Sequence, residues 1–438
     1  MPLAAPDIAH TLLAITAMMM AAHGSGALFA RLRQPRVIGE IVGGLLLGPT
    51  LLGALAPGPQ RWLFPADGPV SIVLGLLQQL GLLLLMFCSG MEIRSVFHRR
   101  EGKTVAWIFL TGTVLPFVAA VLLLRVLDER QFYGPAGNPT SFLLVFAVAM
   151  AVTSIPVISR IMYDLGILDT AFARVVLGVA VIEDILLYVI LAIALGIVAE
   201  TQGGLFGLPS AIGLRAGSVW DVLYHTAATP GILGLFLVLG GPMYQATSRL
   251  RCNLIRQRSP VAYQLVYMLA ACLACMVLGV QPFFGAFVAG MVVGASQDGT
   301  GEAVEAIKSF SFAFFIPIYF AVVGLQLDLL HGFSPLHFVF YFALACLIKA
   351  FSVHVGARMA GESPLSSWNL AVAMNARGGP GIVLASLAYA AGIVSQPFFA
   401  MLVMLAILTS LLAGSWLERV PRDQLLVREY ALPKTGDE

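Results

Sequence analysis

The sequence predicts an all-α polytopic membrane protein with about 13 transmembrane helices, and three observations lead to this prediction. Of its 438 residues, 59% are hydrophobic and 11% are charged, whereas soluble domains carry roughly 25% charged residues. Apolar runs near the roughly 20 residues that cross a bilayer recur along the whole chain. Basic residues are concentrated in alternate loops, which is typical of membrane proteins with a fixed orientation. The lipid bilayer is therefore an expected partner.

Each span is predicted from the length of an apolar run and from the residues that interrupt it. The first run is expected to be a retained span, because no basic segment precedes it. A Gln281-Pro282 turn separates the eighth run from the ninth, and the ninth and tenth runs are short. The expected spans are 8–30, 37–55, 70–91, 104–126, 141–163, 171–199, 223–247, 260–279, 282–296, 309–327, 337–359, 367–392 and 397–417.

The positions of the basic residues predict the orientation. Loops that follow odd-numbered spans carry 19 of the 25 basic residues, the opposite loops carry four, and Lys349 and Arg377 lie inside spans. Because positive charge marks the cytoplasmic side, we expect a multi-pass protein of the cell's inner (plasma) membrane. Its N-terminus would lie outside and its C-terminus in the cytoplasm. The net charge of +2 gives no indication of a nucleic-acid partner.

Two matching interruptions predict a pair of broken helices. Thirteen spans divide into six, one linker and six, which is the inverted-repeat plan of many secondary transporters. Proline removes a backbone donor and opens a helix, and both 141–163 and 367–392 contain proline in a polar stretch. Matching positions in the two halves favour a transport site over two ordinary kinks. The residues expected at the crossing are Thr153, Ser154 and Pro156 in the first helix, and Asn375, Arg377, Gly378, Gly379 and Pro380 in the second.

Two adjacent carboxylates, Glu183 and Asp184, lie in the middle of the apolar span 171–199. Ionisable groups at this depth are costly and indicate function. Neighbours on a helix point about 100° apart, so both can border one cavity while meeting different partners. Burial disfavours a charged carboxylate, which favours the exchange of a proton for a metal cation at this position. The alternative is a buried structural salt bridge.

Lys349 lies well inside an apolar span and is expected to pair with Glu183. The alternative is a snorkelling residue near a helix end, and the residues that follow it up to Arg358 argue against this. Asp184 is the expected cation ligand. Thr153 and Ser154 are expected to add neutral oxygens, which hard cations prefer. Arg377 is assigned equally to a structural role and to the ion path.

Other polar residues carry weaker predictions. Glu40 is either interfacial or functional, His23 and His354 are expected to contact backbone carbonyls, and Cys272 and Cys275 are expected to be packing residues. The chain has no Ser/His/Asp set, HExxH motif or glycine-rich phosphate loop. A transporter without a cofactor is therefore expected, rather than an enzyme.

The chain resembles the sodium/proton exchanger domain of the monovalent cation:proton antiporter family 2. The resemblance covers nearly the whole chain. It rests on QPRVIGEIVGGLLLGPTLLG at 34–53, FCSGMEI at 87–93, AVTSIPVISRIMYDLGIL at 151–168, the acidic span at 178–194, FFGAFVAGMVVG at 283–294 and NARGGPGIVLA at 375–385.

The resemblance implies a homodimer in which a core domain with crossed helices moves against a dimerisation domain. By residue, Asp184 matches the essential ion- and proton-binding aspartate, Lys349 the lysine that pairs with the preceding acid, and Thr153 the threonine at the first break. Glu183 replaces the usual aspartate, and Ser154 stands where some members have an acid. The implied parts are 1–103 and 251–330 (scaffold and dimerisation), 104–200 and 331–417 (core), 201–250 (linker helix) and 418–438 (cytoplasmic tail).

The expected function is secondary active antiport of Na⁺, K⁺ or both against H⁺ by alternating access. The two-acid members of the family move net charge, which favours two protons per cation here. The main alternative is a sodium-coupled organic-solute symporter of the same superfold, which would not need a carboxylate pair opposed by a lysine. A passive channel is disfavoured, because broken helices and a neutralising lysine suit alternating access better than a continuous pore.

Overall fold

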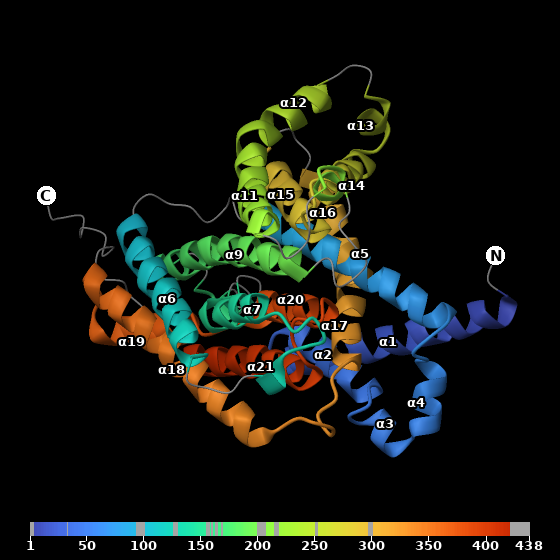
Figure 1. Ribbon diagram of the computed structural model, residues 1–438, viewed down its shortest axis with the longest axis horizontal. Coiled ribbons are helices and arrows are strands. Elements are labelled where there is room, and N and C mark those ends of the chain that lie inside the picture. The colour runs from blue at the N-terminus through green and yellow to red at the C-terminus, as the bar shows by residue number, and fades with distance from the viewer. Residues whose placement is uncertain are drawn as a thin grey trace, which may run out of the picture. The chain divides into compact units, whose positions relative to one another are not determined.

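The structure, a computed structural model, consists of helices joined by loops (Figure 1). It describes residues 4–32, 34–92, 101–125, 130–154, 158, 161–162, 165–167, 170–198, 207–213, 219–249, 253–296 and 301–420. Across these ranges, β-structure is confined to an isolated bridge between Tyr133 and Val394.

The helices confirm the predicted multi-span, all-α architecture. Besides the nine spans given at the end of this paragraph, the described residues contain a bent pair of helices that counts as one more span when taken together. Its members, α19 (Pro364–Ala373) and α20 (Gly378–Ala390), meet at 41°. Two shorter apolar helices are α7 (Pro139–Ala151) and α15 (Pro282–Ala295). The number 13 itself stays a prediction. The part of the chain that is described holds nine helical segments long and apolar enough to cross a membrane: Ala5–Arg31, Arg36–Leu55, Pro69–Met91, Gly102–Leu123, Ala171–Val198, Pro260–Val277, Gly301–Leu325, Pro335–Ala360 and Gln396–Arg419.

Several of these helices begin at the same local signal, a capping side chain followed by proline. The Asn138 side chain accepts a hydrogen bond from the Ser141 N–H at 3.0 Å, and Pro139 is the first residue of α7. Ser259 and Ser363 cap α14 (Pro260–Val277) and α19 in the same way. The cap satisfies a free N–H, and proline has no N–H that would need a partner.

The chain forms two compact units, and unit 1 comprises residues 1–31, 36–95 and 192–330. In it, α2 packs against α1 and α17, and α15 packs against α5 and α14 (Figure 1). Its helices are α1 (Ala5–Arg31), α2 (Arg36–Leu47), α3 (Leu52–Leu55), α4 (Pro57–Leu63), α5 (Pro69–Glu92), α10 (Leu208–Ala211), α11 (Val219–Leu235), η5 (Phe236–Gly240), α12 (Gly241–Arg249), α13 (Leu254–Arg258), α14, α15, α16 (Gly301–Phe310), η6 (Ser311–Phe315) and α17 (Ile316–Leu325).

Glycines allow the helices of unit 1 to approach closely. A methyl group at Gly39 of α2 would lie 2.5 Å from the Ser25 carbonyl oxygen of α1, and one at Gly294 of α15 would lie 2.8 Å from the Met91 Cα of α5. Neither position has room for a side chain. Gly39 and Gly294 are therefore positions of close helix packing.

The tenth span begins earlier than the sequence predicts. It was expected at 309–327, but α16, η6 and α17 form one continuous span, Gly301–Leu325. The first turns carry Glu302, Glu305 and Lys308, which lower the hydropathy of this segment although it remains helical. The segment Ser311–Phe315 is a π-helix.

Unit 2 comprises residues 32–35, 96–191 and 331–438. In it, α6 packs against α7 and α18, α18 packs against α19, and α20 packs against α21 (Figure 1). The first predicted break follows α7 at Ala151, and Pro156 lies outside the described residues. The helices of unit 2 are α6 (Gly102–Leu123), η3 (Arg130–Phe132), α7, α9 (Ala171–Val198, in this unit up to Leu191), α18 (Pro335–Ala360), α19, α20 and α21 (Gln396–Arg419).

Candidate functional site

The two adjacent carboxylates of α9 have different surroundings. Asp184 is 0% exposed, and neither of its carboxylate oxygens has a hydrogen-bond partner in the described part of the chain. Glu183 is 3% exposed, and its Oε1 atom accepts two hydrogen bonds while its Oε2 atom accepts none from the described residues. A buried carboxylate without donors is costly when charged. Asp184 is therefore the group with an unmet need for a proton or a cation.

The Lys349 ammonium of α18 is 0% exposed and uses all three of its donors. It lies 2.6 Å from the Glu183 Oε1 atom, donates to the Gly112 carbonyl at 3.0 Å, and donates to the Ala151 carbonyl. An ammonium group has three N–H bonds, so this set of acceptors is complete. The structure thus pairs Lys349 with Glu183 and leaves Asp184 outside the ion pair.

The first break lies against the second through backbone and hydroxyl contacts. The Thr153 hydroxyl donates to the Met374 carbonyl at 2.6 Å, and the Ser154 N–H donates to the Ala376 carbonyl at 2.6 Å. Thr153 and Ser154 are both fully buried. Because a hydroxyl that donates still has oxygen lone pairs, Thr153 can also act as a neutral ligand.

Arg377 holds the crossing together. Its guanidinium is 1% exposed and donates to the Ala149 and Met150 carbonyls at the end of α7, at 3.0 and 3.2 Å. It also donates to the Ala345 carbonyl of α18 at 3.0 Å, and to both oxygens of Asn375 at 3.2 Å. Positive charge at a helix C-terminus complements the helix dipole. These contacts favour a structural role for Arg377, and its part in the ion path stays a prediction.

The start of α20 is capped by a different helix. The Arg377 N–H lies 3.4 Å from the Thr409 hydroxyl, and the Gly378 N–H lies 3.1 Å from the Ser410 hydroxyl, both on α21. Gly378 has φ +32, which side chains rarely adopt. Gly379 and Pro380 are buried in the first turn of α20.

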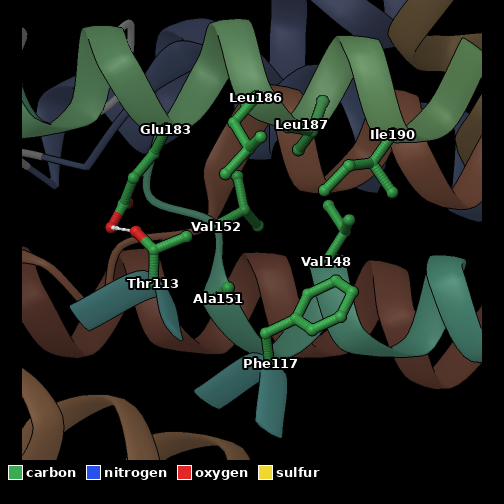
Figure 2. A pocket seen from close by; sticks show the side chains of 9 residues that line it. All are labelled: Thr113, Phe117, Val148, Ala151, Val152, Glu183, Leu186, Leu187 and Ile190. Atoms are coloured by element: carbon green, nitrogen blue, oxygen red, sulfur yellow. Dashed lines mark hydrogen bonds between the residues drawn. The ribbon is translucent and has the colours of Figure 1, made fainter. Parts of the chain in front are cut away.

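A small, partly open cavity adjoins Glu183 (Figure 2). Figure 2 shows the Glu183 side chain on α9 facing Thr113 on α6, whose hydroxyl donates to the Glu183 Oε1 atom at 3.1 Å. Apart from these two polar residues, the cavity is lined by apolar side chains: Phe117, Val148, Ala151, Val152, Leu186, Leu187 and Ile190. The polar end of the cavity is thus at the ion pair.

The other polar residues singled out in the sequence make none of the contacts described above. Glu40, in unit 1, is 8% exposed, and His23 lies 3.0 Å from the Ala313 carbonyl. The His354 and Trp368 ring centroids lie 4.5 Å apart with the rings tilted by 31°, and the contact of His354 with a backbone carbonyl stays a prediction. Cys272 and Cys275 are buried free cysteines.

Sequence reasoning missed Thr113, Thr409 and Ser410. Hydroxyl residues are common in membrane helices and satisfy their own helix carbonyls, so they give no signal individually. For Thr113 the sequence does offer one signal, because this residue lies between Gly112 and Pro116 in the middle of an apolar span.

Comparisons with known proteins agree with this architecture. The fold is similar to that of the sodium proton antiporter MjNhaP1 from Methanocaldococcus jannaschii, with a TM-score of 0.61 and 14% identity, covering 94% of this chain and 98% of that one. This likeness places the chain in the class of helical membrane proteins with that fold.

Relatives extend the similarity to sequence. The chain is 28% identical to the Na(+)/H(+) antiporter NhaS4 of Synechocystis over 89% of its own length and 92% of the relative's. It is 24% identical to the Na(+)/H(+)-K(+) antiporter GerN of Bacillus cereus, over 92% and 94%. It is 29% identical to the K(+)/H(+) antiporter 1 of Saccharomyces cerevisiae, over 87% of this chain but 43% of that one. A family model described as sodium/hydrogen exchanger, transmembrane, matches residues 15–422, and the chain belongs to this family.

Proposed function

We propose that the protein exchanges a monovalent cation, Na⁺ or K⁺, for protons by alternating access. In this proposal the cation and the proton bind in turn to the same residue, Asp184. The observation that carries the proposal is the contrast between the two acids of α9. Glu183 is neutralised by Lys349, whereas both oxygens of Asp184 are buried and receive no hydrogen bond from the described residues. A proton or a metal cation satisfies such a group, and the two compete for it.

The neighbouring residues fit this role. Monovalent alkali cations prefer oxygen ligands, and the crossing brings hydroxyls and carbonyls of Thr153, Ser154 and residues 374–376 together. We propose Thr153 and Ser154 as neutral ligands that complete a site with Asp184. The relatives named above are antiporters for Na⁺ or K⁺, and none of those three is a solute symporter.

Exchange in proteoliposomes tests the proposal. Adding Na⁺ or K⁺ outside acid-loaded vesicles should alkalinise the lumen, and Asp184→Asn should abolish this while the protein keeps its melting temperature. Asp328→Asn, in the loop after α17, is the matched control and should exchange normally. Exchange by folded Asp184→Asn at the wild-type rate would overturn the site assignment, and no response of the wild type to any alkali cation would overturn the function.

We further propose that unit 2 is the ion-carrying core and that unit 1 provides the scaffold and a homodimer interface, in the inner membrane with the N-terminus outside. The excess of basic residues in alternate loops supports this orientation. Reporter fusions at each terminus test the orientation, and the mass of the detergent-purified protein tests the dimer. A cytoplasmic N-terminus or a monomeric mass would contradict the respective proposal.

A further inference from the structure

The ion pair of Lys349 and Glu183 is attached to a third helix, α6, at two adjacent residues. The Gly112 carbonyl accepts a hydrogen bond from the Lys349 ammonium at 3.0 Å, and the Thr113 hydroxyl donates to the Glu183 Oε1 atom at 3.1 Å. Each charged group thus meets a complementary dipole on the same turn. Thr113 and Glu183 both line the cavity of Figure 2.

The Gly112 carbonyl is available because of Pro116. In an α-helix a carbonyl accepts from the N–H four residues later, and for Gly112 that residue is Pro116, which lies inside α6 and has no N–H. The carbonyl is therefore left without its usual donor in the middle of a membrane helix. Lys349 supplies the missing donor.

Small residues bring α6 and α18 close enough for this contact. A methyl group at Gly112 would lie 3.1 Å from the Val353 Cγ2 atom of α18 and 3.9 Å from the Lys349 Nζ atom. One turn away, a methyl group at Gly356 of α18 would lie 2.8 Å from the Trp107 carbonyl oxygen of α6. A larger residue at either position would push the helices apart and lengthen the bond from Lys349 to the Gly112 carbonyl.

We propose that Thr113 and Pro116 are positioning residues of the transport site: with the Gly112 carbonyl, they hold the ammonium on Glu183 and so keep it from competing with the transported cation for Asp184. All three donors of Lys349 are used, and one of the acceptors exists only because residue 116 is proline. The inference rests on the proposed function, in which Asp184 binds the cation.

Pro116→Ala is the decisive variant, because it restores an N–H that can bond the Gly112 carbonyl within α6. Lys349 then loses one of its three acceptors, which weakens its attachment to Glu183 and lets it move toward Asp184 more often. A hydrogen bond to a charged group is worth about a tenfold change in an equilibrium, or more. The apparent KM for the cation should therefore rise about tenfold while kcat stays within about twofold. Pro230→Ala makes the same change inside α11, which contributes no residue to the described site, and should leave KM unchanged.

Thr113 provides a second variant with its own rescue. Thr113→Val removes the donor to Glu183 at nearly constant volume and should raise KM in the same direction, whereas Thr113→Ser keeps the hydroxyl and should restore the wild-type KM. A wild-type KM in both Pro116→Ala and Thr113→Val would overturn the proposal. So would an equal rise in Thr113→Val and Thr113→Ser, because the effect would then not depend on the hydroxyl.

A double-mutant cycle separates this inference from the function on which it rests. In a Lys349→Met background no ammonium remains to be released, so Pro116→Ala should no longer change KM. The Gly112 carbonyl has then lost its Lys349 donor, so the N–H that Pro116→Ala restores should raise the melting temperature more than it does in the wild-type background. The melting temperature needs no transport. If the effects of the two substitutions on the melting temperature were additive, the proposal would be overturned even in a protein that failed to exchange ions. If the effects were clearly non-additive but the wild type showed no exchange, only the proposed function would be refuted.

Discussion

At the scale of single residues, Glu183 and Asp184 differ because neighbours on a helix face different directions. One side chain reaches Lys349 and Thr113, and the other reaches no described donor. The sequence marks both positions as costly and therefore functional, and it also indicates Lys349 as a partner. It does not indicate Thr113 or the two backbone carbonyls, because their availability depends on where α6 and α7 are packed.

Removing Lys349 alone should lower the stability of the protein more than removing both members of the ion pair. Lys349→Met leaves the Glu183 carboxylate buried without a cation, and breaking a buried pair in this way costs about 3–5 kcal/mol. The double variant Lys349→Met/Glu183→Leu has no uncompensated charge and should recover most of the lost melting temperature. Thermal unfolding in detergent measures both proteins. A double variant less stable than the single one would contradict the pairing.

At the scale of elements, the free backbone groups at the end of α7 and at the start of α20 are satisfied by side chains of different kinds. The last three carbonyls of α7 accept from basic side chains, Ala149 and Met150 from Arg377 and Ala151 from Lys349. The first N–H groups of α20 meet hydroxyls of α21. Within a bilayer no water is present to satisfy helix ends, so these side chains make the breaks tolerable.

Substitution of the hydroxyls that cap α20 should therefore loosen its start. Thr409→Val and Ser410→Ala each remove an acceptor for a buried N–H, which costs about 1–3 kcal/mol. Thr16→Val is the control, because the Thr16 hydroxyl also donates to the carbonyl four residues earlier but is exposed on α1. Melting temperatures should fall in both α21 variants and stay unchanged in the control. Hydrogen exchange at Gly378 should rise in Ser410→Ala, and unchanged exchange there would contradict the capping role.

The limits of sequence-based prediction also appear at the scale of elements. Long apolar runs such as Pro335–Ala360 were located within a few residues, because hydropathy alone determines them. The breaks at Ala151 and Asn375 were located because Gly and Pro act locally. The start of α16 was missed, because charged residues at the end of a membrane helix lower its hydropathy without ending it. The partners of Arg377 at the end of α7 could not be foreseen, since Ala149 and Met150 lie more than 200 residues away in the chain.

At the scale of the whole molecule, the charges at the crossing bear on the stoichiometry. The charged residues assigned to the transport site or to the helix crossing are Glu183, Asp184, Lys349 and Arg377, and all four are buried in unit 2. With Lys349 fixed on Glu183, these four sum to zero when Asp184 is empty, and to one positive charge when Asp184 holds either a proton or an alkali cation. The two loaded states then carry equal charge, and exchange is one for one.

The net charge moved per transport cycle should therefore be zero. This differs from the exchange of two protons per cation that the two-acid members of the family led us to expect. That preference requires Glu183 to release Lys349 and bind a second proton. The three hydrogen bonds of Lys349 oppose this step, because freeing the ammonium would leave buried acceptors without donors. Transport currents on a solid-supported membrane should be absent while a pH-sensitive dye still reports exchange. Pro116→Ala weakens the attachment of Lys349, so a small current should appear in that variant. A cation-dependent current in the wild type would instead show that Glu183 titrates during the cycle and that two protons cross per cation.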